Sequence, residues 1–219
     1  MKARHFISIL LAGILTFCIA FPVMADDYSM LGLYTKDGYE NEYFNYQLKL
    51  PEGNWTIESR APLTLADSNP VEESNKENTL SFLKTSLDFS HATGFSASSD
   101  TDFVSIIIQS PGLFNDKWAD EKTIAETSFE SVIDELESVS EDNEDVTVTQ
   151  INGQVDYVDS FIDGKHYCCV YDYLLNGIPF YGIQIYVRSD DGDYLSVIDL
   201  QSFYPERVEE LSKCFTKLK

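Results

Sequence analysis

The chain has 219 residues, of which 15 are Lys or Arg and 37 are Asp or Glu, so its formal charge at pH 7 is −22. Such an acidic chain repels phosphate backbones and anionic lipid surfaces, which argues against nucleic acid and membrane surfaces as partners. The charge is typical of a soluble exported protein, or of one that meets cationic partners or Ca²⁺. The length fits one large domain with a hydrophobic core.

The N-terminus carries the pattern of a secretory signal peptide. Lys2 and Arg4 precede an uncharged apolar run from Phe6 to Ala20, and small residues lead to a cleavage site after Ala25. We therefore expect residues 1–25 to be removed and the mature chain to be secreted, with no stable membrane span, because the run is short for a spanning helix. Removing two basic residues and no acidic residue changes the formal charge from −22 to −24.

The first half of the mature chain predicts an arm followed by strands and one helix. Residues 26–42 are polar and are expected to form a flexible N-terminal arm, which leaves 43–219 as a single domain. Apolar residues alternate with polar ones in Tyr43–Leu50, which indicates a strand. A leucine stripe predicts a helix within 71–88, and Phe103–Gln109 is apolar on both faces, as in a central, covered strand.

Two more helices and a strand are predicted in the second half. Lys122–Val139 has apolar residues at spacings of four and three, the pattern of one buried helix face. Val146–Ile151 is predicted to be a strand. Pro205 is expected to open the last helix, whose apolar stripe continues to the C-terminus through Val208, Leu211, Cys214, Phe215 and Leu218.

Residues 154–200 predict a meander of four antiparallel strands. Asp163-Gly164 and Asn176-Gly177 are dipeptides typical of tight type I′ hairpins, in which both central residues adopt positive φ. Two-residue loops would place Ile162 opposite Lys165 and Leu175 opposite Ile178.

Because side chains alternate between the faces of a sheet, this register assigns each meander residue to one of two faces. The aliphatic face collects Val155, Tyr157, Phe161, His166, Cys168, Val170, Leu174, Tyr181, Ile183, Ile185 and Val187. The aromatic face collects Val158, Ile162, Tyr167, Cys169, Tyr171, Tyr173, Phe180, Tyr186 and Arg188, with Gly182 opposite Tyr171. We expect helices to cover the aliphatic face.

These elements predict an α+β fold, an antiparallel β-sheet flanked by helices. Residues 41–55, NEYFNYQLKLPEGNW, resemble the opening "N-x-x-F-x-Y-x-hydrophobic-x-L-P-E-G-W" of exported clostridial proteins of unknown function, with Asn54 inserted before the Trp. The order of the later elements is similar too, down to Ser202-Phe203. The resemblance implies a PsbP/Mog-like α/β/α sandwich, a superfamily of mainly binding and assembly proteins with no shared catalytic residues.

The sequence shows no catalytic or metal-binding constellation. The mature chain has three cysteines and no Cys-x-x-Cys, and His91 and His166 lack the spacing of paired zinc ligands. We predict no cofactor. If a disulfide forms, Cys168 and Cys214 are the expected partners, because Cys168 shares the aliphatic face that the last helix is expected to cover. His166 is expected beside Phe161 in a structural role.

The leading hypothesis is an exported, non-catalytic domain that binds an unknown protein or small ligand at the cell surface. If the aromatic face is partly open, its candidate ligand-binding residues are Tyr167, Tyr171, Tyr173, Phe180 and Tyr186, with Lys165 and Arg188 as a positive edge that attracts an anionic group. If a helix covers that face, the same rings are core residues. An exported hydrolase with dispersed Asp, Glu, Ser and His residues is the alternative function.

Overall fold

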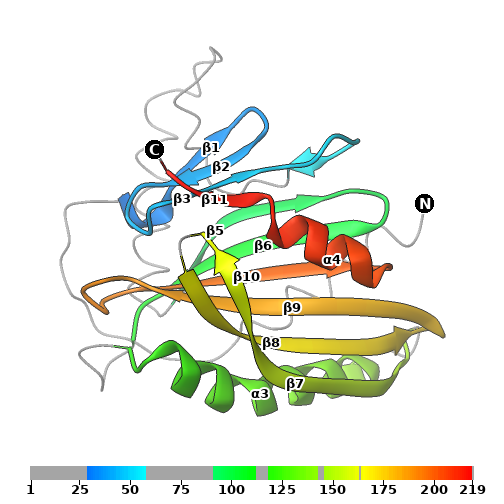
Figure 1. Ribbon diagram of the computed structural model, residues 1–219. Coiled ribbons are helices and arrows are strands. Elements are labelled where there is room, and N and C mark those ends of the chain that lie inside the picture. Colours follow the sequence, from blue (N-terminus) through cyan, green and yellow to red (C-terminus); the bar gives the residue numbers. More distant parts are fainter. Residues whose placement is uncertain (1–28, 58–90, 112–117, 143–145, 163, 219) are drawn as a thin grey trace, which may run out of the picture.

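Two antiparallel sheets face each other in the computed structural model, which describes residues 29–57, 91–111, 118–142, 146–162 and 164–218 (Figure 1). The larger sheet has seven strands in the order β4-β5-β6-β10-β9-β8-β7, and the smaller has four in the order β1-β2-β3-β11. The seven-stranded sheet comprises β4 (Thr56–Ile57), β5 (His91–Ser98), β6 (Asp102–Gln109), β7 (Val148–Phe161), β8 (Gly164–Leu175), β9 (Ile178–Arg188) and β10 (Leu195–Ser202). The four-stranded sheet comprises β1 (Leu33–Thr35), β2 (Gly38–Asn41), β3 (Tyr46–Lys49) and β11 (Phe215–Lys217).

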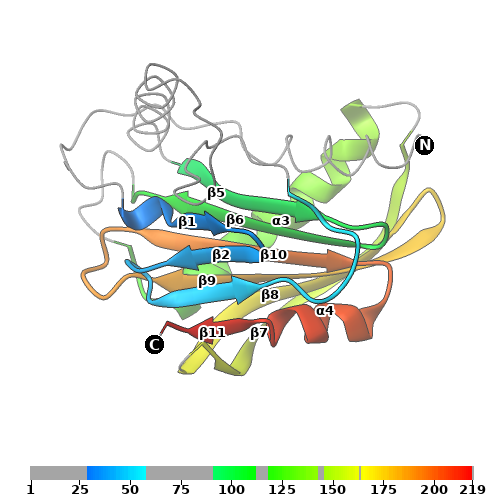
Figure 2. The ribbon, with the colours of Figure 1, turned by 90° about the horizontal axis from the view of Figure 1, so that it is seen from above.

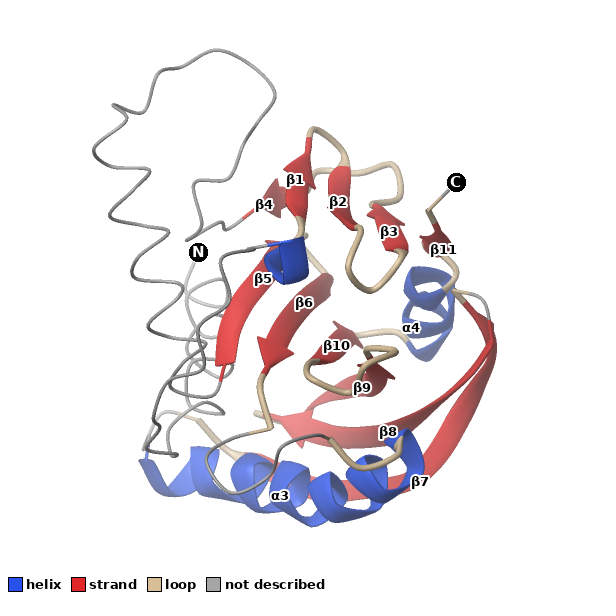
Figure 3. Cartoon of the chain, turned by 90° about the vertical axis from the view of Figure 1, so that its left-hand side faces the viewer, coloured by secondary structure: helices blue, strands red, loops and turns tan. Residues whose placement is uncertain are grey.

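The architecture corrects the expected fold class. The described part of the chain is mostly antiparallel β-structure with two α-helices, so it is essentially a β-sandwich and not an α/β/α sandwich flanked by helices. Figures 2 and 3 show the four-stranded sheet lying over one face of the seven-stranded sheet, with helix α3 (Glu121–Asp142) across the opposite face. The short helix α4 (Pro205–Ser212) lies beside the four-stranded sheet and joins β10 to β11.

The expected N-terminal arm is ordered from Ser29 onward. A 3₁₀ turn, η1 (Ser29–Leu31), leads into β1 and β2, and Tyr39 is completely buried between the sheets. The Tyr39 hydroxyl donates to the carbonyl of Leu31 at 2.6 Å, and Asn41 Nδ2 donates to the carbonyl of Met30 at 2.9 Å. Strands of three and four residues offer too little alternation to be recognised in a polar stretch, so the sequence predicted no strand within residues 26–42.

The last predicted helix ends earlier than its apolar stripe suggested. Helix α4 stops at Ser212, and Phe215 and Lys217 pair with Leu48 and Tyr46 of β3. The Phe215 side chain is buried in the core between the sheets. Pairing with β3 satisfies backbone groups that the helix would have satisfied internally, and it overrides the helical periodicity.

Two predictions are confirmed in detail. Strand β6 lies in the interior of its sheet, between β5 and β10, and is buried along almost its whole length. Helix α3 buries Ala125, Val132 and Leu136 against the sheet, as the spacing required. The helix expected within 71–88 lies outside the described residues.

The meander register is confirmed at its second turn and wrong at its first. Asn176 and Gly177 both have positive φ (52° and 78°), and Leu175 pairs with Ile178 as predicted. At the first turn the positive φ falls on Ser160 and Ile162, with Phe161 paired to Gly164 and a bulge before it. Val155 therefore pairs with Cys169 and not with Asp172, so Val155 and its neighbour Tyr157 lie on the aromatic face.

Candidate functional site

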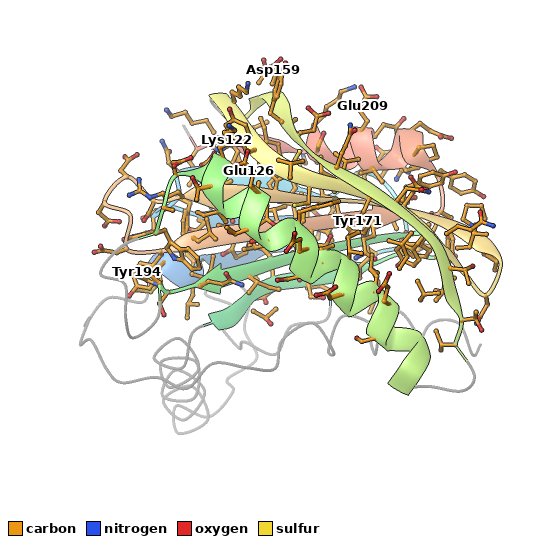
Figure 4. The ribbon with its side chains drawn as sticks, turned by 90° about the horizontal axis from the view of Figure 1, so that it is seen from below. Lys122, Glu126, Asp159, Tyr171, Tyr194 and Glu209 are labelled. Carbon is orange, nitrogen blue, oxygen red and sulfur yellow. The ribbon has the colours of Figure 1, made fainter. Side chains whose placement is uncertain are left out.

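The aromatic face is covered by helix α3 along most of its length. Tyr171, Tyr173 and Phe180 pack with Val132 and Leu136 of α3, and each of the three rings is less than 5% exposed. Tyr186 is 1% exposed and belongs to a neighbouring cluster with Ile124 and Ala125 of the same helix. Figure 4 shows α3 crossing the sheet, with Tyr171 near its middle. A recognition surface on this face would need solvent-exposed rings. Tyr171, Tyr173, Phe180 and Tyr186 are instead core residues beneath α3.

A polar network lies beneath α3 at the centre of this face. The Tyr171 hydroxyl donates to Asp199 Oδ1 at 2.7 Å, and Gln201 Nε2 donates to Asp199 Oδ2 at 2.7 Å and to the Tyr171 oxygen at 3.0 Å. The Tyr171 ring lies over Gly182, where a Cβ atom would come within 2.2 Å of the ring. Burial raises the pKa of Asp199 to about 6, because the charged carboxylate is removed from water. The network provides a hydrogen bond to each oxygen of this carboxylate, but all three residues are buried and not accessible to a ligand from solvent.

An open depression of about 350 Å³ lies at the N-terminal end of α3, where the aromatic face ends. Three predicted ligand-binding residues line it: Lys165 and Tyr167 from β8 and Arg188 from the end of β9. No pattern in the sequence predicted that the start of α3 would lie beside them. The remaining lining residues are Asp120, Glu121, Lys122, Ser189 and Asp190.

The depression forms where β8 and β9 separate. Their paired residues run from Leu175–Ile178 to Cys168–Ile185, so Lys165 and Arg188 lie beyond the paired region and are not ladder partners as the register implied. Glu121, the first residue of α3, spans this opening. Its carboxylate accepts the Arg188 backbone N–H at 3.0 Å, and both of its oxygens lie within 3.1 Å of His166 Nδ1 on β8. One side chain therefore connects the helix to both strands.

Arg188 is held by the segment that precedes α3. Its Nε donates to the carbonyl of Trp118 at 3.1 Å, and the Trp118 backbone N–H donates to the carbonyl of Gly192 at 2.9 Å. The guanidinium packs directly on Gly192, where a Cβ atom would come within 2.2 Å of Nη2. The absence of a side chain at Gly192 thus makes room for the Arg188 fork.

Lys165 is placed by aromatic rings and not by a carboxylate. Its Nζ lies 3.4 Å from the ring centroid of Tyr157 and 5.1 Å from that of Tyr167, which are cation–π geometries. Among the described residues, neither Lys165 nor Arg188 forms an ion pair. Within the described part of this strongly acidic chain, neither positive charge therefore has a carboxylate oxygen within the 4.0 Å of an ion pair.

The first turn of α3 is closed by Asp120. The Thr123 backbone N–H donates to Asp120 Oδ1 at 3.1 Å, and the Thr123 hydroxyl donates to Oδ2 at 2.8 Å. These hydrogen bonds, the backbone one foremost, lower the pKa of Asp120. The Asp120-x-x-Thr123 pattern of an N-cap is the sequence signal that could have located this side of the depression.

The cysteines lie on two different faces. Cys168 is buried in the core between the sheets and Cys214 packs at the edge of that core, as the face assignment required, while Cys169 lies under α3. The three described cysteines are free thiols, so the structure contains no Cys168–Cys214 disulfide. Burial raises the pKa of the Cys168 thiol to about 12, which makes it a poor nucleophile.

His166 lies beside Phe161, as predicted, with the ring centroids 5.9 Å apart. The described residues contain no group of three or more His, Cys, Asp or Glu side chains that could hold a metal ion.

In the described part of the chain, neither helix has the length and apolar character needed to cross a membrane. No protein-family model matches this chain, and no curated protein matches it either.

Proposed function

We propose that the protein is an exported, non-catalytic binding domain whose site is the depression at the start of α3. The ligand carries an anionic group that contacts Lys165 and Arg188. The observation that carries this proposal is that both side chains line one depression and neither has an ion pair among the described residues. An anion there gains charge-assisted hydrogen bonds from a guanidinium fork that is already positioned.

The acidity of the rest of the molecule shapes this interaction. A chain with a formal charge of −22 repels anions at long range, so the attraction is confined to groups that have entered the depression. Such a site selects for complementary shape and for short-range hydrogen bonds. It suits a small ligand better than an extended polyanion.

Export is the second part of the proposal, and it rests on the signal-peptide pattern of residues 1–25. Expression in a bacterium with a general secretion pathway should give an extracellular or envelope protein whose N-terminus is Asp26. Intact-mass measurement of the recovered protein checks this directly. A product that keeps Met1 and stays in the cytoplasm contradicts export.

Binding is tested by titrating ¹⁵N-labelled residues 26–219 with acetate, phosphate and citrate at constant ionic strength. We expect saturable shifts of amide signals near Glu121, Lys165 and Arg188 for at least one anion. Lys165→Met should weaken that binding several-fold. Lys36→Met removes the same charge from the exposed turn between β1 and β2 and should leave it unchanged. Shifts that do not saturate, or equal effects of both variants, contradict the proposal.

One contact favours the hydrolase alternative. A carboxylate that orients an imidazole, as Glu121 orients His166, is half of a nucleophile-activating arrangement. Ser189, which lines the depression, does not complete this arrangement, because its hydroxyl donates to Asp191 Oδ1 at 2.6 Å and accepts the Tyr194 backbone N–H at 3.0 Å. Turnover of an ester or glycoside substrate that is lost in His166→Gln would replace the binding proposal.

A further inference from the structure

Most polar side chains of the depression are already engaged within the protein. Asp120 caps α3 through both oxygens, and Glu121 joins His166 to the Arg188 backbone. Lys122 forms an ion pair with Glu126 at 3.3 Å. Ser189 is engaged with the β9–β10 turn. These groups hold the walls of the depression in place.

The groups that remain have both signs of charge. The Lys165 ammonium, the Nη groups of Arg188 and the Tyr167 hydroxyl have no hydrogen-bond acceptor among the described residues. The carboxylate of Asp190 is exposed, and no Lys or Arg nitrogen of the described residues lies within 4.0 Å of it. Opposite charges thus line the same depression without neutralising each other.

We infer that the ligand of this depression is a small zwitterion of the α-amino acid type. This inference rests on the proposed function and names its ligand class. The ligand carboxylate contacts Lys165 and Arg188, and the ligand ammonium contacts Asp190. The volume of about 350 Å³ is at the lower end of the range for small-molecule sites, which fits a ligand of this size.

The test measures how much the ammonium group contributes to binding. Each common L-amino acid is titrated into residues 26–219 by calorimetry, and the tightest binder is compared with its analogue that lacks the amino group and with its analogue that lacks the carboxylate. We expect the amino acid to bind about fivefold more tightly than the deamino analogue, the upper range for one partly solvated ion pair. The amine without a carboxylate should bind weakest.

Asp190→Asn identifies the residue responsible. This variant should reduce the gap between the amino acid and its deamino analogue to less than about twofold, while the deamino analogue itself binds as it does to the wild type. Asp37→Asn, the same change in the turn between β1 and β2, should keep the whole gap. If Asp190→Asn does not fold, Asp190→Ser repeats the measurement.

The outcomes separate this inference from the proposed function. Equal affinities for the amino acid and its deamino analogue overturn the zwitterion but leave an anion-binding site. A gap that survives at Asp190→Asn also overturns it, because another group then holds the ammonium. If no amino acid binds while acetate, phosphate or citrate does, the ligand class is wrong. If none of these probes binds, the proposed function fails as well.

Discussion

Single residues decide how tightly α3 can close on the sheet. Gly182 has no side chain, and the Tyr171 ring occupies the space above it, fixed there by hydrogen bonds to Asp199 and Gln201. A larger residue at position 182 would displace a ring that has no room to move, since α3 lies above it.

Gly182→Ala should therefore destabilise the protein by about 1–3 kcal/mol, the usual range for overpacking a core. Gly164→Ala is the matched control, because its Cβ would meet no atom within 4 Å. Urea denaturation of both variants gives the comparison. In a Tyr171→Ala background the Gly182→Ala cost should largely disappear, and a cost that persists there would place the clash elsewhere.

Asp199 makes part of the stability depend on pH. Its folded pKa of about 6 lies above the ordinary value of 3.8, so the folded state binds the proton more tightly than the unfolded state does. The stabilisation is fully present below pH 3.8 and is lost as the pH rises through about 6. Other carboxylates titrate in the same range, so a comparison between variants is needed to isolate it.

Asp199→Asn removes this pH dependence, because the amide side chain does not titrate. The free energy of unfolding of the variant minus that of the wild type should rise by about 2 kcal/mol between pH 4 and pH 7.5. Any fixed cost of the amide in the network shifts the difference equally at every pH. Urea denaturation across this pH range measures it, and the exposed Asp37→Asn variant should show a flat difference. A flat difference for Asp199→Asn would mean that its carboxyl titrates normally.

At the scale of elements, α4 is fixed to the seven-stranded sheet by one ion pair. Arg207 Nη2 donates to Asp102 Oδ2 at 2.9 Å, and the Ser202 hydroxyl donates to Asp102 Oδ1 at 2.7 Å. The Asp102 carboxylate is almost fully buried at the start of β6, whereas Arg207 is 30% exposed. Helix α4 therefore covers a charge that has few other partners.

Arg207→Met should cost about 2–4 kcal/mol, because it leaves the Asp102 carboxylate buried with only the serine hydroxyl. Lys213→Met, which breaks the exposed pair with Glu209 on the same helix, should have a much smaller effect. Adding Asp102→Asn to Arg207→Met should recover part of the loss. Equal unfolding midpoints for the two single variants would show that the buried pair contributes no more than the exposed one.

Elements differ in how far the sequence could predict them. Helix α3 and strand β6 have long, regular apolar patterns, and the Asn176-Gly177 turn fixes the β8–β9 register locally. The four-stranded sheet has no such signal, because its strands have three or four residues each and its fourth strand resembled the end of a helix. At the end of β7, positive φ at Ser160 and at Ile162, the residue after the strand, shifted the register, and neither residue type favours that conformation.

Local sequence patterns could predict the strand residues of the depression but not the helix residues. Alternation along β8 and β9 placed Lys165, Tyr167 and Arg188 on one face. The start of α3 comes more than forty residues before β8, and nothing in the local pattern brings Glu121 to the opening between the strands. Tertiary packing supplies that half of the site.

At the scale of the whole molecule, the excess of acidic residues opposes folding. A formal charge of −22 over 219 residues brings like charges together in the compact state, and the described ion pairs are few. Salt screens such repulsion over a Debye length of about 8 Å at 0.15 M.

Raising NaCl from 10 mM to 300 mM at pH 7.5 should therefore raise the unfolding temperature of residues 26–219 by several degrees. The surface ion pairs lose some strength over the same range, but each contributes little. Differential scanning calorimetry checks the shift, with KCl as a test that the effect is general for monovalent salts. A lower unfolding temperature in salt would mean that attractive pairs outweigh the repulsion.

The pairing of β11 with β3 affects when the molecule can fold. Phe215 pairs with Leu48, so the four-stranded sheet brings together segments that lie 167 residues apart in the chain (215 − 48). Until residue 217 leaves the ribosome, β3 lacks one of its two partner strands and the aliphatic face of the large sheet lacks part of its cover. Contacts so distant in sequence form slowly. The complete sandwich can therefore close only after β11 has been made, and an incompletely closed chain is easier to thread through a translocation channel than a fully folded one.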